Sequence, residues 1–119
     1  MGRSVTYSDR ENVIVEAGPE AIEKILSGTD MAAKERLLLC LDRYMDPWFG
    51  YNLSYLSEIE LLLEQVIAGT NTISVKEDAI NLLCDYSYPP FPILAESLGQ
   101  IEEELKPDVR YLLNMDKEM

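Results

Sequence analysis

Carboxylates are the side chains that offer this chain the most chemistry, since 22 of its 119 residues are Asp or Glu. Carboxylates that share a helix face can hold Mg²⁺ against a phosphate group, as in a metal-dependent phosphohydrolase. Glu60 and Glu64, four residues apart, do share one face of a helix, whereas Glu58 and Glu60 do not. The sequence has no basic cluster to hold a phosphate, so we expect no metal site and rank a phosphohydrolase last among the functions considered.

Other catalytic chemistry lacks the residues that it needs. The chain has no histidine, which removes the usual general base, the usual partner of a nucleophilic Ser or Cys, and the commonest transition-metal ligand. Cys40 and Cys84 each lie in a run of leucines, so we expect reduced, buried thiols. No glycine-rich phosphate loop is present. The sequence therefore predicts a protein that is not an enzyme and that has neither catalytic residues nor a cofactor.

Two proline-containing segments concentrate aromatic side chains. DPWFGYN (residues 46 to 52) has Pro, Gly and Asn, which favour a turn, and DYSYPPFP (residues 85 to 92) cannot continue a helix through consecutive prolines. Aromatic residues in a loop either fold back as plugs over the core or form a contact surface for a partner. Both roles remain open for Trp48, and we favour the plug for Phe49 and Phe91.

A contact surface would draw its partner-binding residues from these loops and from acidic positions beside them. Tyr and Trp supply large contact areas at low entropic cost, and binding hot spots are often aromatic residues ringed by polar ones. The residues that we expect to bind a partner are Trp48, Tyr51, Glu58, Glu60, Asp85, Tyr86 and Tyr88.

The net charge of −12 is concentrated in the C-terminal part of the chain. Residues 1 to 50 carry nine acidic and six basic side chains, a net of −3, and residues 51 to 119 carry thirteen and four, a net of −9. Such a field repels nucleic acid and anionic lipid and speeds association with a basic protein, although many well-solvated proteins are equally acidic. The sequence has no long apolar run or signal peptide, so we expect a cytoplasmic protein without nucleic-acid or membrane partners.

Apolar residues recur with helical spacing along nearly the whole chain, which predicts an all-α fold. At the N-terminus, Ser8 and Glu11 fit a capping box; the following residues fit either a helix or a short strand, and we favour the helix. Pro19 and Gly28 bracket a short helix. Asp30 can cap the next helix through its side-chain carboxylate, and we expect this longer helix to be central in the fold.

The C-terminal two thirds of the chain carry further helix signals. Gly69 ends the helix that follows the first aromatic loop. Ser74 and Glu77 form a capping-box pattern, which predicts that the next helix starts there. Pro107 can open a last short helix. Between the second aromatic loop and this proline, four apolar residues recur at intervals of four, three and four, which predicts a helix over this range. They are Leu94, Leu98, Ile101 and Leu105.

An internal repeat is suggested by shifting the chain by 44 residues. The shift aligns Asp30 with Ser74 as helix caps and superposes the Leu-Leu-Cys segments of the two helices. Residues 30 to 68 and 74 to 106 would then be two helical hairpins of the size found in HEAT or armadillo repeats. We predict one domain, residues 1 to 119, made of about five to seven helices in stacked antiparallel hairpins, with both aromatic loops along one edge.

The segment VKEDAINLLCDYSYPPFPIL, residues 75 to 94, has a pattern that is also found in a family of known proteins. A helix runs into a loop of Asp, Tyr and two prolines, and a second helix follows. In this pattern, and in its small size and acidity, the chain resembles the all-helical immunity proteins of contact-dependent growth inhibition and related bacterial polymorphic toxin systems. The resemblance covers about the C-terminal half. It implies neutralisation of a cognate toxin domain, often a basic nuclease, by tight binding over or near its active site.

The sequence thus favours an immunity protein that binds a basic protein toxin domain through aromatic anchors and an acidic surface. The alternative from a different class is a helical-repeat adaptor or regulatory protein with no toxin partner. We expect a monomer, although the stacked hairpins would also suit a dimer.

Overall fold

The computed structural model describes residues 8 to 115, and every regular element in this range is helical. The predicted all-α class, with five to seven helices, is confirmed. The helices are α1 (Asp9–Ala17), α2 (Pro19–Leu26), α3 (Met31–Met45), α4 (Leu56–Ala68), α5 (Ile73–Tyr86), α6 (Pro92–Ser97) and α7 (Lys106–Leu113), with short 3-10 helices η1 (Pro47–Phe49) and η2 (Leu98–Gln100). None of the helices within residues 8 to 115 has the length and apolar character needed to cross a bilayer.

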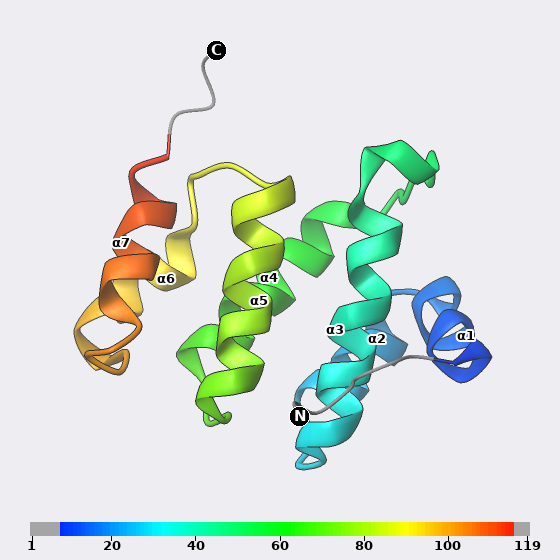
Figure 1. Cartoon of the computed structure of the whole chain (residues 1–119), viewed down its shortest axis with the longest axis horizontal. Coiled ribbons are helices and arrows are strands. Elements are labelled where there is room, and N and C mark those ends of the chain that lie inside the picture. The colour runs from blue at the N-terminus through cyan, green and yellow to red at the C-terminus, as the bar shows by residue number, and fades with distance from the viewer. Residues whose placement is uncertain (1–7, 116–119) are drawn as a thin grey trace, which may run out of the picture.

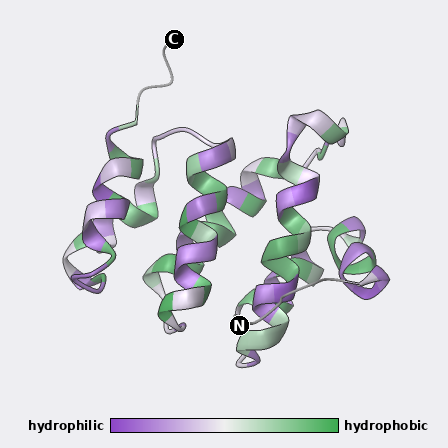
Figure 2. Ribbon diagram, in the orientation of Figure 1, coloured by the Kyte–Doolittle hydropathy of each residue, from purple (hydrophilic) through white to green (hydrophobic). Residues whose placement is uncertain are grey.

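The helices pack in two rows (Figure 1). Helices α1, α3, α5 and α7 lie side by side in one row, and α2, α4 and α6 form the row behind it. The core lies between the rows and includes the fully buried side chains of Ile22, Leu41, Ile59, Leu63 and Leu83. Each such side chain stabilises the fold by roughly 1.5–3 kcal/mol. Figure 2 shows the corresponding hydrophobic bands alternating with hydrophilic ones along α3 and α5. The likeness to HEAT or armadillo repeats stays a prediction.

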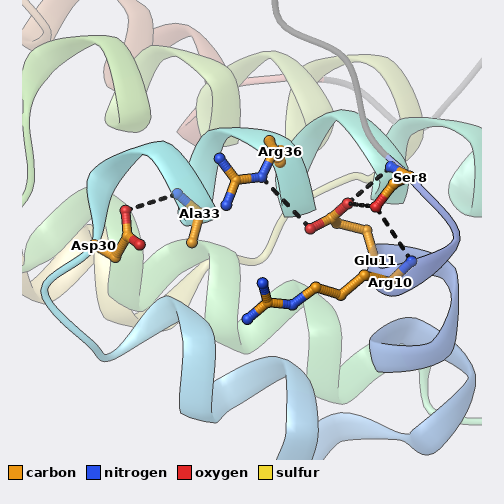
Figure 3. A network of polar contacts seen from close by, with 6 residues as sticks. All are labelled: Ser8, Arg10, Glu11, Asp30, Ala33 and Arg36. Atoms are coloured by element: carbon orange, nitrogen blue, oxygen red, sulfur yellow. Dashed lines mark hydrogen bonds and ion pairs between the residues drawn. The ribbon is translucent and has the colours of Figure 1, made fainter.

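The start of α1 resolves the choice between helix and strand in favour of the helix (Figure 3). The Ser8 backbone N–H donates to Glu11 Oε1 at 2.8 Å, and the Arg10 N–H donates to Ser8 Oγ at 3.2 Å, as in a capping box. Arg36 of α3 lies 3.6 Å from the Glu11 carboxylate and so links the two helices. Burial pushes the pKa of Glu11 up, but the hydrogen bonds from Ser8 and the charge of Arg36 together bring it below its ordinary value.

The predicted cap of α3 is confirmed, whereas the predicted cap of α5 is wrong. Asp30 Oδ1 accepts a hydrogen bond from the Ala33 N–H at 3.1 Å (Figure 3). In α5, Thr72 and not Ser74 is the cap, because Thr72 Oγ1 accepts from the Val75 N–H at 3.2 Å. Both residues have a suitable hydroxyl. With Thr72 as the cap, Ile73 joins the helix and packs on the core.

Removal of the two hydroxyls should distinguish the caps by stability. Thr72→Ala is expected to lower the free energy of unfolding by about 1 kcal/mol, because the first turn of α5 loses its side-chain acceptor. Ser74→Ala, at an exposed position in the same turn, should change it by less than about 0.5 kcal/mol. Urea denaturation followed by circular dichroism measures both. A larger loss for Ser74→Ala would contradict this assignment.

The caps seen in the structure also change the number of residues by which the two copies of the predicted internal repeat are shifted. Asp30 and Thr72 are 42 residues apart, whereas the predicted offset was 44. An offset of 44 pairs Leu39, which is 37% exposed, with Leu83, which is fully buried. An offset of 42 instead pairs buried residues with buried residues, as in Leu37 with Ala79, Leu41 with Leu83, and Lys34 with Lys76. The burial pattern of α3 therefore recurs in α5 after 42 residues.

The predicted helix from Leu94 to Leu105 is interrupted. Helix α6 ends at Ser97, η2 follows, and α7 begins only at Lys106. Gly99 lies at the break, and a glycine inside a helix costs about 1 kcal/mol relative to alanine. The last hairpin is therefore shorter than the α3–α4 hairpin. Helix α7 carries Pro107 in its first turn, as predicted.

Candidate protein-binding site

The first aromatic loop holds a tryptophan out into solvent. Asp46 ends α3, and its Oδ1 accepts from the Trp48 N–H at 2.9 Å, which fixes the first turn of η1. Gly50 then turns the chain with a φ of 75°, a conformation that favours glycine. Trp48 is 86% exposed and Phe49 is 47% exposed. Neither is a plug over the core, so the preference for burial of Phe49 was wrong.

Contacts at the base of this loop fix its position against α3. The Tyr51 ring lies against the Tyr44 ring, with centroids 4.4 Å apart. Tyr44 in turn donates from its hydroxyl to Glu16 Oε2 of α1 at 2.8 Å. The Arg43 guanidinium lies 5.0 Å from the centre of the Phe49 ring, within cation–π range. The loop therefore presents Trp48 from a base held by side-chain contacts to α3, which is itself hydrogen-bonded to α1.

The second aromatic loop divides its side chains between core and solvent. Phe91 is 3% exposed and is the plug that its sequence context predicted. Tyr88 is 48% exposed. Tyr86 donates its hydroxyl to Asp42 Oδ1 of α3 at 2.6 Å, and this bond, followed by burial, raises the pKa of Tyr86 above its ordinary value. Ser87 donates to Glu60 Oε2 of α4 at 2.7 Å. The loop is thus tied to both rows.

The two loops lie at the same end of the helix rows (Figure 1). The loop after α3 brings Trp48 and Tyr51 there, and the end of α5 brings Asp85, Tyr86 and Tyr88. Glu58 and Glu60 lie in the first turns of α4, and the Glu60 carboxylate accepts a hydrogen bond from Ser87 of the second loop. The predicted partner-binding residues with exposed side chains are Trp48, Tyr51, Glu58, Asp85 and Tyr88, whereas Tyr86 and Glu60 are half-buried and hydrogen-bonded internally.

Helices α3 and α5 also enclose a groove of about 360 Å³. Its lining residues are Glu35, Leu38, Leu39 and Asp42 of α3, and Ser74, Asp78, Asn81, Leu82 and Asp85 of α5. Only Asp85 among them was expected to bind a partner. A signal was nevertheless present, because each helix has two carboxylates seven residues apart with leucines between them. That spacing places side chains on one face of a helix, two turns apart.

The predicted carboxylate pair of α4 has structural partners. Glu64 is 2% exposed, and its Oε1 accepts from the Ile93 and Leu94 N–H groups at 2.9 and 3.2 Å. It therefore caps α6 from the neighbouring helix. Glu60 faces Ser87 instead. Within residues 8 to 115, no group of three or more His, Cys, Asp or Glu side chains could hold a metal ion.

Neither cysteine forms a disulfide; Cys40 is buried, as expected, whereas Cys84 is only partly buried. Cys40 is fully buried, and burial raises its pKa to about 11, so its thiol stays protonated at neutral pH. Cys84 is half-buried, and burial followed by the charge of Asp85 raises its pKa as well. Both shifts disfavour the thiolate that nucleophilic chemistry requires.

The chain matches no protein-family model, no curated protein and no solved structure. Its function is therefore inferred from the exposed aromatic residues, the groove and the charge. The groove and most of the exposed aromatic residues lie on or between α3 and α5 and the loops that follow them, whereas the negative charge belongs to the chain as a whole.

Proposed function

We propose that this protein binds a basic protein partner and that it acts as an immunity protein, neutralising a cognate toxin domain by occupying its surface. The observation that carries the proposal is Trp48, the only tryptophan of the chain, which is 86% exposed. A side chain of this size gains most from burial, so its exposure on a fixed turn suits a residue that becomes buried in a complex.

The fixed base of the loop supports a role in binding. A partner that buries Trp48 need not order the loop, because Asp46 already fixes the turn and Tyr51 already packs on Tyr44. Association costs less free energy when the contact residues are preorganised in this way. Exposed Tyr51 lies in the same loop as this anchor, and Tyr88 is exposed in the second loop, at the same end of the helix rows. Such an arrangement of one large anchor with amphipathic neighbours is typical of an interface hot spot.

The charge of the chain supports a basic partner. At −12, the protein attracts cationic surfaces and repels anionic ones. A toxin that cleaves nucleic acid must itself carry a cationic surface, because it neutralises phosphates when it binds its substrate. An acidic protein that docks on that surface competes directly with the substrate. This is how the acidity of the chain would contribute to neutralisation.

The proposal is tested by recovering the partner and measuring its association with the chain. A basic toxin domain encoded beside this gene should bind the purified protein, and co-production of this protein should protect cells from it. The association rate should fall at least about tenfold as salt screens the charges. Glu58→Lys should slow association, whereas Glu20→Lys, an exposed control on α2, should do so less. A bound partner without toxic activity would contradict the immunity role.

A further inference from the structure

We infer that a second cavity of the protein, between α2, α3 and α4, binds a small aliphatic carboxylate whose charged group pairs with Lys34. The cavity has a volume of about 270 Å³ and lies where α2 and α4 end and α3 begins. Figure 1 shows the connections that follow α2 and α4 at the opposite end of the helix rows from the two aromatic loops. The site is separate from Trp48, so it does not rest on the proposed function.

Lys34 is a buried cation on the wall of this cavity. It is 2% exposed, and its Nζ donates to the neutral amide oxygen of Asn71, which also lines the cavity. Asn71 is held in turn, because its Nδ2 donates to the Val66 carbonyl at 2.9 Å. An ammonium has three N–H groups, and no Asp or Glu within residues 8 to 115 forms an ion pair with this one. Lys34 therefore retains two donors for a ligand.

The environment of Lys34 disfavours its charge. Burial lowers the pKa of the Lys34 ammonium below its ordinary value, and no neighbouring carboxylate raises it again. A buried charge is ordinarily paired, because its removal from water costs several kcal/mol unless an opposite charge and hydrogen bonds compensate. A bound carboxylate would supply both forms of compensation at this nitrogen.

Lys76 shows how the same fold completes a buried lysine. It follows Lys34 by 42 residues, the offset at which the burial pattern recurs, and it is 4% exposed. Its Nζ donates to both carboxylate oxygens of Glu102, each at 2.9 Å, and Glu102 lies 26 residues further along the chain. The residue 26 positions after Lys34 is Glu60, but Glu60 accepts from Ser87 instead. The carboxylate that pairs with Lys76 thus has no counterpart at Lys34.

The other walls of the cavity indicate which carboxylate fits. Leu26, Leu62 and Val66 line it and offer an aliphatic body an apolar contact. The volume is below the usual range for drug-sized ligands, so the site suits a molecule of a few carbons. Glu23 is the only acidic lining residue; it is exposed, and solvent screens its charge more than that of buried Lys34. The net charge of −12 repels nucleic acid and other polyanions, whereas one carboxylate matches one ammonium.

The test uses 4-methylpentanoate as the probe and 4-methylpentanamide as its uncharged match. Calorimetry with the unaltered protein at about pH 7 should give a dissociation constant of about 1 mM or tighter for the carboxylate. The amide should bind at least about tenfold more weakly, because it replaces charge-assisted hydrogen bonds with neutral ones. In amide NMR spectra, the resonances of Gly28 and Gly69, which line the cavity, should shift with the carboxylate.

Three variants assign the binding to Lys34. Lys34→Met keeps the length of the side chain without its charge and should weaken carboxylate binding at least about tenfold. Asn71→Asp places a carboxylate of the chain at the Lys34 Nζ and should weaken it by a similar factor. Lys24→Met is the matched control: Lys24 is exposed on α2 and does not line the cavity, so affinity should be unchanged. Circular dichroism confirms that each variant is folded.

Two results would overturn the inference: absence of saturable binding by the unaltered protein, or carboxylate affinity that survives in folded Lys34→Met. Equal affinities for the carboxylate and the amide would overturn it as well, and this comparison decides the matter even if a variant does not fold. None of these results bears on the proposed function, which depends on Trp48 at the other end of α3 and fails only if no basic toxin domain binds.

Discussion

Glu64→Ala is expected to destabilise the protein by about 2–5 kcal/mol. The side chain is 2% exposed and accepts two backbone hydrogen bonds at the start of α6, from Ile93 and Leu94. Helix α6 has no capping side chain of its own at its first turn, so this carboxylate from α4 is what satisfies these two donors. Its removal leaves buried N–H groups without a partner and opens a cavity between α4 and α6.

Glu64→Gln is the matched control, because its amide oxygen can still accept both N–H groups. Burial raises the pKa of the Glu64 carboxyl above its ordinary value, ahead of the lowering effect of the two hydrogen bonds. The folded state therefore binds this proton more tightly than the unfolded state does. The part of the stability that is linked to this proton is present below the unfolded pKa and is lost as pH rises through the folded pKa, while the carboxylate still accepts the two hydrogen bonds. Glutamine does not titrate and avoids that loss.

Urea denaturation of the three proteins at about pH 4 and about pH 7 measures both effects. The Gln variant should gain stability relative to the unaltered protein as pH rises between these values, and the Ala variant should be the least stable at both. Equal losses for Ala and Gln would show that the two backbone donors do not depend on Glu64.

Local signals in the sequence predicted most of the helix starts correctly. The capping box at Ser8, the cap at Asp30 and the proline in the first turn of α7 each act within one turn of helix, so a short stretch of sequence contains the whole interaction. The start of α5 was missed because Thr72 and Ser74 are both competent caps. In the structure Thr72 accepts the hydrogen bond and Ile73 packs against the core, which is a tertiary contact that local cap signals do not contain.

The two aromatic loops were predicted, but the burial of their side chains was predicted only in part, for the same reason. Trp48, Phe49 and Phe91 all lie in proline-containing loops, yet the first two are exposed and the third is buried. Propensity and spacing cannot separate them, because burial depends on where each loop meets the two rows. The groove was missed for a related reason. Its two rims lie about 40 residues apart in the chain, and only the packing of α3 against α5 brings them together.

Trp48→Ala is expected to weaken binding of the basic partner by at least about thirtyfold, which corresponds to about 2 kcal/mol for an interface hot spot. The same change should alter the free energy of unfolding by less than about 0.5 kcal/mol, because the side chain is 86% exposed and buries little area in the free protein. The turn itself remains, since Asp46 accepts from the backbone N–H of residue 48. Loss of affinity can then be attributed to the contact.

Tyr111→Ala is the control for this experiment. Tyr111 is 62% exposed on α7, and α5 lies between α7 and α3, the helix that leads into the first aromatic loop, so its removal takes an exposed aromatic ring from a part of the surface distant from Trp48 (Figure 1). Its loss should leave both affinity and stability unchanged. Trp48→Phe, which keeps an aromatic ring on the same turn, should recover part of the affinity.

The most direct test measures partner affinity by calorimetry and unfolding by circular dichroism on the same preparations of the unaltered protein, Trp48→Ala and Tyr111→Ala. If Trp48 is a binding anchor, the Trp48→Ala variant alone loses at least about thirtyfold in affinity while all three proteins unfold at the same urea concentration. A lower unfolding midpoint for Trp48→Ala with unchanged affinity would contradict this account and make Trp48 a structural residue.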